Sequence, residues 1–245
     1  MSIGDLHLGD PHVDMDAFNT VIQWVLAKPN RYAIINGDIG NHALPGSPSD
    51  SAAETVNTNE QIKRAKELLA PLFAANRILA WNDGNHEYRV YKASDGLNMG
   101  EIICDKFGKV DLYAGDGAFL KLSLGKQTGK DGNGKHVVYG VYVTHGNGGG
   151  KRPGSKANNV EDLQRIVVAD LYVINHVHMP MAFSKQIFIP DYTNGMVKPM
   201  EQKFVCSGSF LAWGGYGERK GYSPSALGCP VMRLEGRRKK VNVGV

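Results

Sequence analysis

Residues 77–87 read RILAWNDGNHE, and this stretch decides the fold. The apolar run from Arg77 to Trp81 predicts a short buried strand, which gives way at once to the polar segment 83–86. The same change occurs earlier, where Arg31 to Asn36 predicts a strand that ends at Gly37-Asp38. Loops at strand ends converge on one site in layered α/β proteins, so residues far apart in sequence meet there.

Helical patterns alternate with these strands in the first half of the chain. An apolar stripe from Phe18 to Val25 predicts a helix that begins near Asp14 and ends before Pro29. A second stripe, from Ile62 to Leu72, predicts another helix with a kink or a restart at Pro71. This alternation is the signal for an α/β fold.

After a third predicted helix, over residues 99–107, the pattern changes to hairpins. Phe119 to Leu124 and His136 to Thr144 predict strands joined through Gly132-Asn133-Gly134. Residues 159–167 predict a helix, and Asp170 to Ile174 predict a strand that ends at His176-Val177-His178. Further short strands are expected at residues 186–189, 204–207 and 231–234, and the basic run 236–240 resembles a polar hairpin tip.

Composition excludes several classes of protein. The 245 residues are 42% hydrophobic and 21% charged, and no Pro/Ser-rich or charged linker divides them, so we expect one domain over residues 1–245. The net charge of +4 suits a phosphate-bearing substrate without requiring one.

Without an apolar run long enough for a membrane span, or a leader pattern, we expect a cytoplasmic protein with no membrane association. Three widely spaced cysteines indicate neither a disulfide framework nor a cysteine zinc site.

Acidic, amide and imidazole groups recur at the ends of successive predicted strands. They are Asp5-Leu6-His7, Gly37-Asp38, Gly84-Asn85-His86, Thr144-His145 and His176-Val177-His178. Carboxylate and neutral imidazole bind Mn, Fe, Zn or Ni, and no thiolate is available to select a softer ion. One such motif is weak evidence, whereas five in this order predict a pair of divalent cations at the strand ends.

This set of motifs resembles that of the calcineurin-like metallophosphoesterases, over roughly residues 1–180. The resemblance implies a four-layer αββα sandwich of two mixed β-sheets flanked by helices, with two divalent metal ions. We expect Mn²⁺, with Fe, Zn or Ni as alternatives. By this resemblance Asp5, His7 and His178 bind the first metal, Asn85, His145 and His176 bind the second, and Asp38 bridges them.

The resemblance also implies a reaction. Metal-activated hydroxide would hydrolyse a phosphate ester, with Asp38 and His86 as the catalytic residues and His86 donating a proton to the leaving oxygen. We expect a phosphodiesterase, with DNA or RNA as a candidate substrate. Two alternatives remain open: a small-molecule phosphomonoesterase or nucleotide phosphohydrolase, and a non-catalytic metal-binding scaffold. No protein partner is predicted.

The chain departs from the family pattern at four places. Asn175 stands where glycine usually precedes the final H-x-H, and asparagine tolerates the left-handed backbone that such a turn requires. The segment after Asp38 lacks Asp-Arg-Gly, and no arginine precedes Gly84, which disfavours protein phosphatase activity. Only residues 2–4 precede Asp5, so we expect an unusually short first strand, as in a truncated start.

The candidate substrate-binding residues are Asn41, His42, Lys151 and Arg152. A surface-loop histidine is an equal alternative for His42. The loop 146–152 does not match a nucleotide phosphate loop, because Arg152 stands where Ser or Thr is required. Its position after His145 suggests that its basic residues border the metal site, although flexible glycines and a solvated basic run explain it equally well.

Two other features have open interpretations. Aromatic and basic residues mix over residues 213–222 as on a nucleic-acid surface, although aromatics in such a glycine-rich stretch also pack against a core. His12 and His136 are expected to be structural or solvent-exposed.

Overall fold

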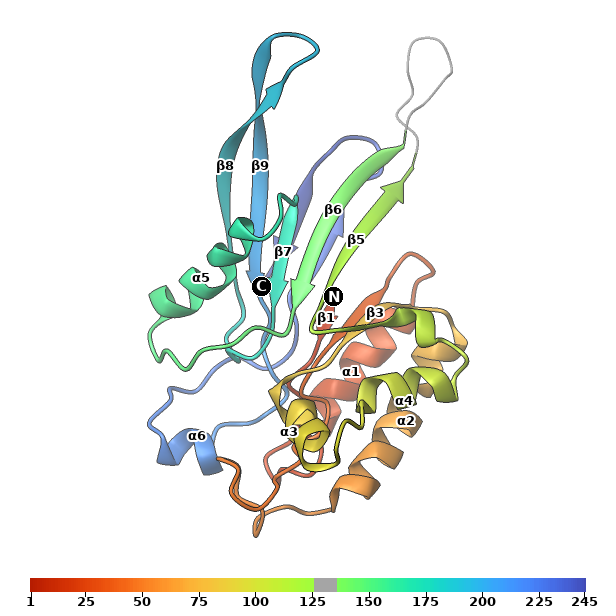
Figure 1. Ribbon diagram of the computed structural model, residues 1–245, viewed down its shortest axis with the longest axis vertical. Helices are drawn as coiled ribbons and strands as arrows, with labels where there is room; N and C mark the ends of the chain where they lie inside the picture. Colours follow the sequence, from red (N-terminus) through yellow and green to blue (C-terminus); the bar gives the residue numbers. More distant parts are fainter. Residues whose placement is uncertain (126–135) are drawn as a thin grey trace.

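The computed structural model describes residues 1–125 and 136–245, which form an α/β fold with two main sheets (Figure 1). The predicted turn Gly132-Asn133-Gly134 lies outside the described residues. No helix of the described chain is long and apolar enough to cross a membrane.

The first sheet has the strand order β1-β2-β3-β4, and all of its strand pairs are parallel. Its strands are β1 (Ser2–Ile3), β2 (Ala33–Asn36), β3 (Ile78–Asn82) and β4 (Tyr113–Gly115). The strands expected over residues 31–36 and 77–81 are therefore confirmed, with ends that shift by one or two residues. The first strand is short, as expected.

The second sheet is mixed and has the order β5-β6-β7-β9-β8. Its strands are β5 (Gly117–Leu124), β6 (Val137–Thr144), β7 (Leu171–Ile174), β8 (Met181–Asp191) and β9 (Met196–Cys206). The three central strands run parallel, and each outer pair is antiparallel. We expected both sheets to be mixed. The second sheet is mixed, whereas the first sheet is parallel, so the expectation is wrong for the first sheet. A separate hairpin joins β10 (Val231–Leu234) to β11 (Val241–Gly244), with the basic run 236–240 at its tip.

The six α-helices of the described residues are α1 (Met15–Leu26), α2 (Thr58–Ala74), α3 (Asn85–Ala93), α4 (Met99–Lys106), α5 (Pro153–Glu161) and α6 (Gly215–Arg219). The Asp14 side chain accepts a hydrogen bond from the backbone N–H of Ala17 and so caps α1. The apolar stripe of α1 is buried, as its spacing predicts. Helix α2 continues through Pro71 without a second start.

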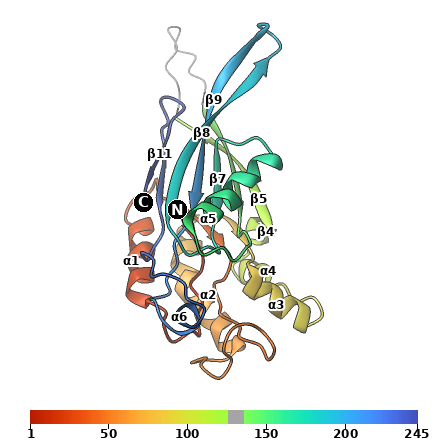
Figure 2. The same ribbon diagram turned by 90° about the vertical axis from the view of Figure 1, so that its left-hand side faces the viewer.

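Several elements differ from the sequence-based expectations. Helix α3 was not predicted, because only its first residues and Val90 are buried and its apolar stripe is weak. Helix α5 begins at Pro153 rather than at Asn159, because proline suits the first turn of a helix, where no backbone N–H is needed. Strands β8 and β9 have 11 residues each and extend beyond the rest of the sheet as an arm (Figure 2). Strand β11 was also not predicted.

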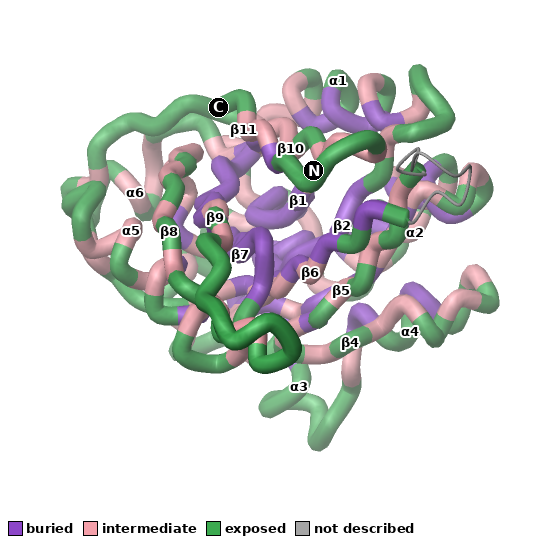
Figure 3. Tube along the Cα trace, turned by 90° about the horizontal axis from the view of Figure 1, so that it is seen from above, coloured by how far each residue is buried: buried purple, intermediate pink, exposed green. Residues whose placement is uncertain are grey.

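Buried side chains form three apolar clusters. Figure 3 shows that many of the buried residues lie along the central strands. The first joins the β1–β3 part of the parallel sheet to α1, α2 and α4. The second lies between the two sheets, where Ile34 and Ala80 meet Tyr139 and Val173. The third joins β7 and β9 to α5 and the turn after it.

A polar network crosses this apolar contact just below the strand ends. The fully buried Asn36 amide donates to the Asn175 side chain at 2.9 Å and to the Thr144 carbonyl at 2.9 Å. Asn82 donates to the Asn36 side-chain oxygen at 2.8 Å, and Ser2 donates to that of Asn175 at 2.7 Å. These bonds tie β1, β2 and β3 of one sheet to β6 and β7 of the other, directly below the predicted ligands.

The network also explains Asn175. Its backbone is not left-handed; the left-handed residue is the next one, His176, with φ 65°. The expectation that asparagine stands here for its tolerance of that conformation is therefore wrong. Asn175 is retained instead for its buried side-chain oxygen, which accepts from Ser2 and Asn36.

Removing the centre of this network should destabilise the fold. We expect Asn36→Ala to lower the free energy of unfolding by about 3 kcal/mol, because it removes three buried hydrogen bonds, which join Asn36 to Asn175, to Asn82 and to the Thr144 carbonyl. Chemical denaturation measures this difference. Asn19→Ala, at an exposed position of α1, is the matched control and should change stability by less than about 0.5 kcal/mol. Equal effects of the two substitutions would contradict this role of the network.

Candidate metal centre

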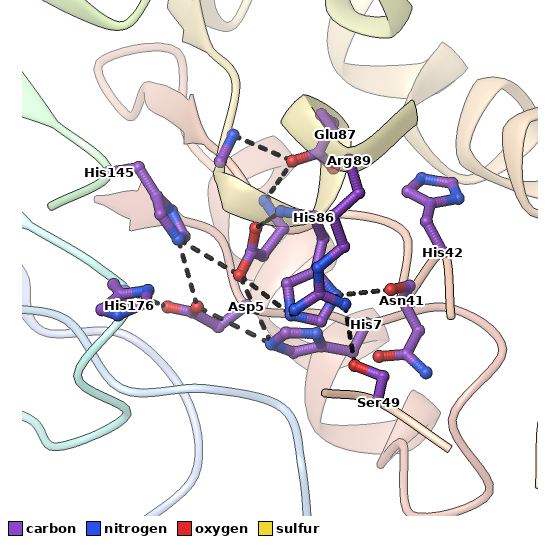
Figure 4. Close-up of polar contacts among 12 residues, drawn as sticks. Asp5, His7, Asn41, His42, Ser49, His86, Glu87, Arg89, His145 and His176 are labelled. Carbon is purple, nitrogen blue, oxygen red and sulfur yellow. Dashed lines mark hydrogen bonds and ion pairs between the residues drawn. The ribbon is translucent and has the colours of Figure 1, made fainter. Parts of the chain in front are cut away.

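The strand ends bring the predicted ligands to one place (Figure 4). Asp5 and His7 follow β1, Asp38 follows β2, and His145 follows β6. The remaining candidates are Asn85 and His86, which open α3, and His176 and His178, which follow β7. Backbone hydrogen bonds from Asp5 N to Gly37 O and from His7 N to Asp38 O, both 3.0 Å, continue the pairing of β1 and β2 into these turns.

Asp5, His7 and His178 form one group whose ligand atoms lie within 4.8 Å of one another. The Nε2 atom of His178 lies 3.1 Å from Asp5 Oδ1 and 3.2 Å from His7 Nε2. His7 Nε2 lies 3.8 Å from the same Asp5 oxygen. This is the set expected for the first metal.

Asp38, His145 and His176 form a second group at the same spacing, with 3.2 Å between Asp38 Oδ2 and His145 Nε2. The same Asp38 oxygen lies 3.9 Å from His7 Nε2 and so faces both groups, as a bridging ligand must. His86 Nε2 lies 3.7 Å from it and completes a third, overlapping group with His7 and Asp38.

Unpaired ligand atoms show that these residues fit cations. Asp5 Oδ1, Asn85 Oδ1 and His145 Nε2 are buried and form no hydrogen bond within the described residues. Nearby imidazole and carboxylate atoms do not meet hydrogen-bond geometry. A buried polar atom without a partner costs about 1–3 kcal/mol. Two divalent cations would satisfy these three atoms, and nitrogen and oxygen donors suit Mn, Fe, Zn or Ni.

Hydrogen bonds orient three of the ligands so that one atom of each faces the centre. The backbone N–H of His176 donates to Asp5 Oδ2, and that of His86 donates to Asp38 Oδ1, both at 2.9 Å. Each carboxylate is thereby left with one inward oxygen. His145 Nδ1 donates to the Asn36 carbonyl at 2.7 Å, which leaves Nε2 as the ligand atom.

Backbone strain is concentrated in this cluster. Eight non-glycine residues of the described chain have positive φ, and five of them are predicted ligands: Asp5 (52°), His7 (52°), Asp38 (53°), His176 (65°) and His178 (50°). Such conformations cost about 1–3 kcal/mol each and persist where the surrounding structure enforces them. The left-handed turns direct side chains two residues apart to the same centre, which supports a functional role for these residues.

The carboxylates give the cluster its charge. Burial alone would raise the pKa of Asp5, but the imidazoles of His178, His7 and His145 hold it well below its usual range. The pKa of Asp38 is likewise lowered against the effect of burial, chiefly by His145 and His86. Burial also opposes protonation of His145, yet Asp38 and Asp5 raise its pKa to about 10. Both carboxylates therefore remain ionised at neutral pH and attract cations.

Glu87 holds the turn that carries Asp38. Its carboxyl accepts hydrogen bonds from the backbone N–H groups of Asp38 (2.7 Å), Ile39 (2.8 Å), Gly84 (2.9 Å) and Gly40 (3.3 Å). Burial raises the pKa of Glu87 to about 7, and Asp38 and Asp83 add to this effect, while the N–H donors favour the ionised form. Only glycine fits at position 84, because a Cβ there would lie 2.2 Å from Asp38 Oδ1.

The four predicted substrate-binding residues lie in different surroundings. Asn41 is buried, and its carbonyl contacts His86 Nδ1. The His42 ring is 0% exposed, so the alternative of a surface-loop histidine is wrong, and this conformation does not open the ring to substrate. Lys151 and Arg152 are exposed, and Lys151 Nζ lies 5.8 Å from the centre of the Tyr222 ring.

The aromatic and basic segment lies against the loop that follows His145. The Tyr222 hydroxyl donates to the Gly149 carbonyl at 3.2 Å, and Trp213 Nε1 donates to the Tyr222 carbonyl at 2.9 Å. Trp213 and Tyr216 remain 51% and 40% exposed. Elsewhere, His12 pairs with Asp10 at 3.0 Å, and the exposed His136 contacts the Gly125 carbonyl, so both match the expectation made for them.

Sequence reasoning missed Glu87 and Arg89 as residues of the site. Both lie on α3, whose i, i+3 spacing places Arg89 beside His86. The capping pattern of Gly84 followed by Glu87 was the available signal for this helix. No family model matches the chain, and no curated protein matches it.

The Glu87 contacts generate a test of stability. We expect Glu87→Gln to lower the free energy of unfolding by about 3 kcal/mol, because the amide NH2 would face backbone N–H donors. Chemical denaturation at neutral pH measures this difference in the free energy of unfolding. Glu67→Gln, at an exposed position of α2, is the matched control and should leave stability unchanged. An unchanged stability would mean that Glu87 is protonated in the fold and accepts fewer bonds than described above.

Metal addition gives a second test. Mn²⁺ at a thousandfold excess over its dissociation constant should stabilise the protein by about 4 kcal/mol and raise Tm, because the unfolded chain lacks the site. Asp38→Asn, which can still accept from the His86 N–H, should reduce both the shift and the bound Mn²⁺ measured by elemental analysis. Asp16→Asn, exposed on α1, should retain both. Fewer than one Mn²⁺ bound per wild-type chain would contradict the site.

Proposed function

We propose that the protein is a dinuclear metal-dependent phosphoesterase of the calcineurin-like kind, and specifically a phosphodiesterase. The observation that carries the proposal is the convergence of two ionised carboxylates, four imidazoles and the Asn85 amide on one centre, with Asp38 facing both groups. The proposal includes a four-layer αββα arrangement. The three apolar clusters, which join helices to sheet, sheet to sheet and sheet to helix, support that arrangement.

The residues of each group have separate roles in this proposal. Asp5, His7 and His178 would hold one metal, while Asn85, His145 and His176 would hold the other, with Asp38 between them. Two bound divalent cations supply a nucleophile at neutral pH by lowering the pKa of water, and they offset the charge that develops on the phosphate. The protein keeps the carboxylate and imidazole ligands in place through bonds from the His86 and His176 N–H groups and to the Asn36 carbonyl.

His86 is the group that would transfer a proton to the leaving oxygen. Its Nδ1 contacts the Asn41 carbonyl, so the proton resides on Nδ1 and Nε2 faces the cluster. Burial lowers the pKa of His86 to about 3, against the opposing effect of Asp38. An anionic phosphate beside Nε2 would raise this pKa and favour the doubly protonated ring, which would then donate its Nε2 proton to the leaving oxygen.

Nucleic acid is the candidate substrate within this class. Lys151 and Arg152 lie on the loop that follows His145, where they are free to meet backbone phosphates. Exposed Trp213 and Tyr216 offer rings for base stacking, which contributes about 1–3 kcal/mol per base. A small-molecule monoester or nucleotide would use the metal cluster alone, and a scaffold would bind metal without turnover.

A substrate comparison tests the proposal. Wild-type protein with Mn²⁺ should hydrolyse a bis-aryl phosphate diester faster than an aryl monoester, and it should cleave single- or double-stranded DNA. His86→Ala should lower kcat by about 10²- to 10⁴-fold. Asp38→Asn should lose metal and activity together, whereas the exposed control Asp16→Asn should retain both.

Each other outcome selects a different function. Faster hydrolysis of the monoester would favour a phosphomonoesterase. Stoichiometric Mn²⁺ binding with no turnover of any of these substrates would favour the scaffold.

A further inference from the structure

Arg89 extends from α3 to the edge of the metal cluster (Figure 4). Its Nη2 lies 3.0 Å from His86 Nε2, and its Nη1 donates to the Ser49 hydroxyl at 2.8 Å. Ser49 belongs to the loop between β2 and α2, so two distant segments meet at this guanidinium. Within the described residues Arg89 forms no ion pair with a carboxylate.

This environment is unusual for an arginine. The side chain is partly buried, yet its hydrogen-bonding partners are a hydroxyl and an imidazole, both neutral. The guanidinium has five N–H donors and is always charged, but it contacts only Ser49 Oγ and the two ring nitrogens of His86, Nδ1 and Nε2, at 2.8, 3.2 and 3.0 Å. Lys92, one turn further along α3, is a contrast: it is exposed and stacks over Tyr88 at 4.7 Å.

The position of the Arg89 guanidinium beside His86 indicates which group it would bind. His86 Nε2 lies 3.0 Å from Arg89 Nη2 and 3.7 Å from Asp38 Oδ2, so the guanidinium and the bridging carboxylate flank one ring nitrogen. A phosphoryl group that brings its leaving oxygen to His86 therefore also brings another oxygen to Arg89. Charge-assisted bonds to an oxyanion are about twice as strong as neutral ones, so phosphate would displace the imidazole as the partner of Arg89.

We propose that Arg89 and Ser49 form an anion subsite that binds a non-bridging oxygen of the substrate phosphoryl group. The guanidinium donates charge-assisted hydrogen bonds to such an oxyanion, and the Ser49 hydroxyl supplies a further donor. The inference rests on the proposed function, since it concerns the substrate of the same site. The Arg89–Ser49 subsite would bind a charged phosphate ester in preference to a neutral ester.

The Ser49 loop is also tied to the aromatic segment. Asp50, the next residue, pairs with Arg219 of α6 at 3.4 Å. The subsite is therefore bordered by α3 on one side and by the segment that carries Trp213 and Tyr216 on the other. A phosphate held at Arg89 would leave the rest of its ester directed along these exposed rings.

Binding of inorganic phosphate to the Mn²⁺-loaded protein tests the subsite without turnover. By calorimetry, Arg89→Ala should raise the phosphate Kd about 10- to 100-fold, as expected for loss of hydrogen bonds to a charged group. The phosphate Kd of Arg89→Lys should lie between those of the wild type and Arg89→Ala, because lysine keeps the charge but not the planar fork of donors. Ser49→Ala should raise Kd about 2- to 10-fold. Lys92→Ala, which removes a cation from the same helix, is the matched control and should leave Kd unchanged.

Two readouts separate a binding role from a structural one. All four variants should bind as much Mn²⁺ as the wild type and retain its Mn²⁺-induced rise in Tm. With the bis-aryl diester, Arg89→Ala should raise KM, and Arg89→Lys should recover part of the loss. An unchanged phosphate Kd in Arg89→Ala, or loss of Mn²⁺ from Arg89→Lys, would overturn the subsite.

Failure of the proposed function gives a different result. If the wild-type protein binds Mn²⁺ and phosphate through Arg89 but hydrolyses no ester, the phosphoesterase proposal fails and the anion subsite stands. If the wild type hydrolyses the diester while Arg89→Ala matches it in phosphate Kd and KM, the subsite alone fails.

Discussion

One buried carboxyl group, that of Glu87, holds the turn on which the site depends. It accepts from the backbone N–H groups of Asp38 and Ile39 in the turn after β2 and from that of Gly84 at the start of α3. Those bonds fix the relative position of β2, β3 and α3, and thereby of Asp38, Asn85, His86 and Arg89. The Asn36 network does the same between the sheets, so His145 and His176 meet the residues of the parallel sheet.

Such support is necessary because the ligand arrangement is unfavourable by itself. Five ligands have left-handed backbone, two carboxylates are buried close together, and three ligand atoms have no hydrogen-bond partner. Each of these features costs free energy that the surrounding packing and hydrogen bonds must offset. Cations would relieve the charge and the unpaired atoms together, which is why the cluster is better understood as a metal centre than as a structural core.

Sequence reasoning succeeded where a local signal was strong. The strands at 31–36 and 77–81 and the helices at 18–25 and 62–72 follow from hydrophobic periodicity, and the structure has them. The metal-ligating residue types were visible because D-x-H and H-x-H motifs recur at strand ends. Sequence reasoning failed for α3, because Val90 is the one apolar residue among its buried side chains, and for the start of α5. It also failed for the length of the β8–β9 arm, which pairing between the two strands decides.

The sequence by itself determined the chemistry that is available: two carboxylates, a set of imidazoles and an amide at successive strand ends, with no thiolate among them. Only the tertiary structure decided which atoms meet and which partners orient them. The contacts of Glu87 with residues 38–40, of Asn36 with Asn175, and of Arg89 with Ser49 join segments 40 or more residues apart. No local pattern encodes such pairs, because they form only when both sheets have packed and the strand-end turns are brought together.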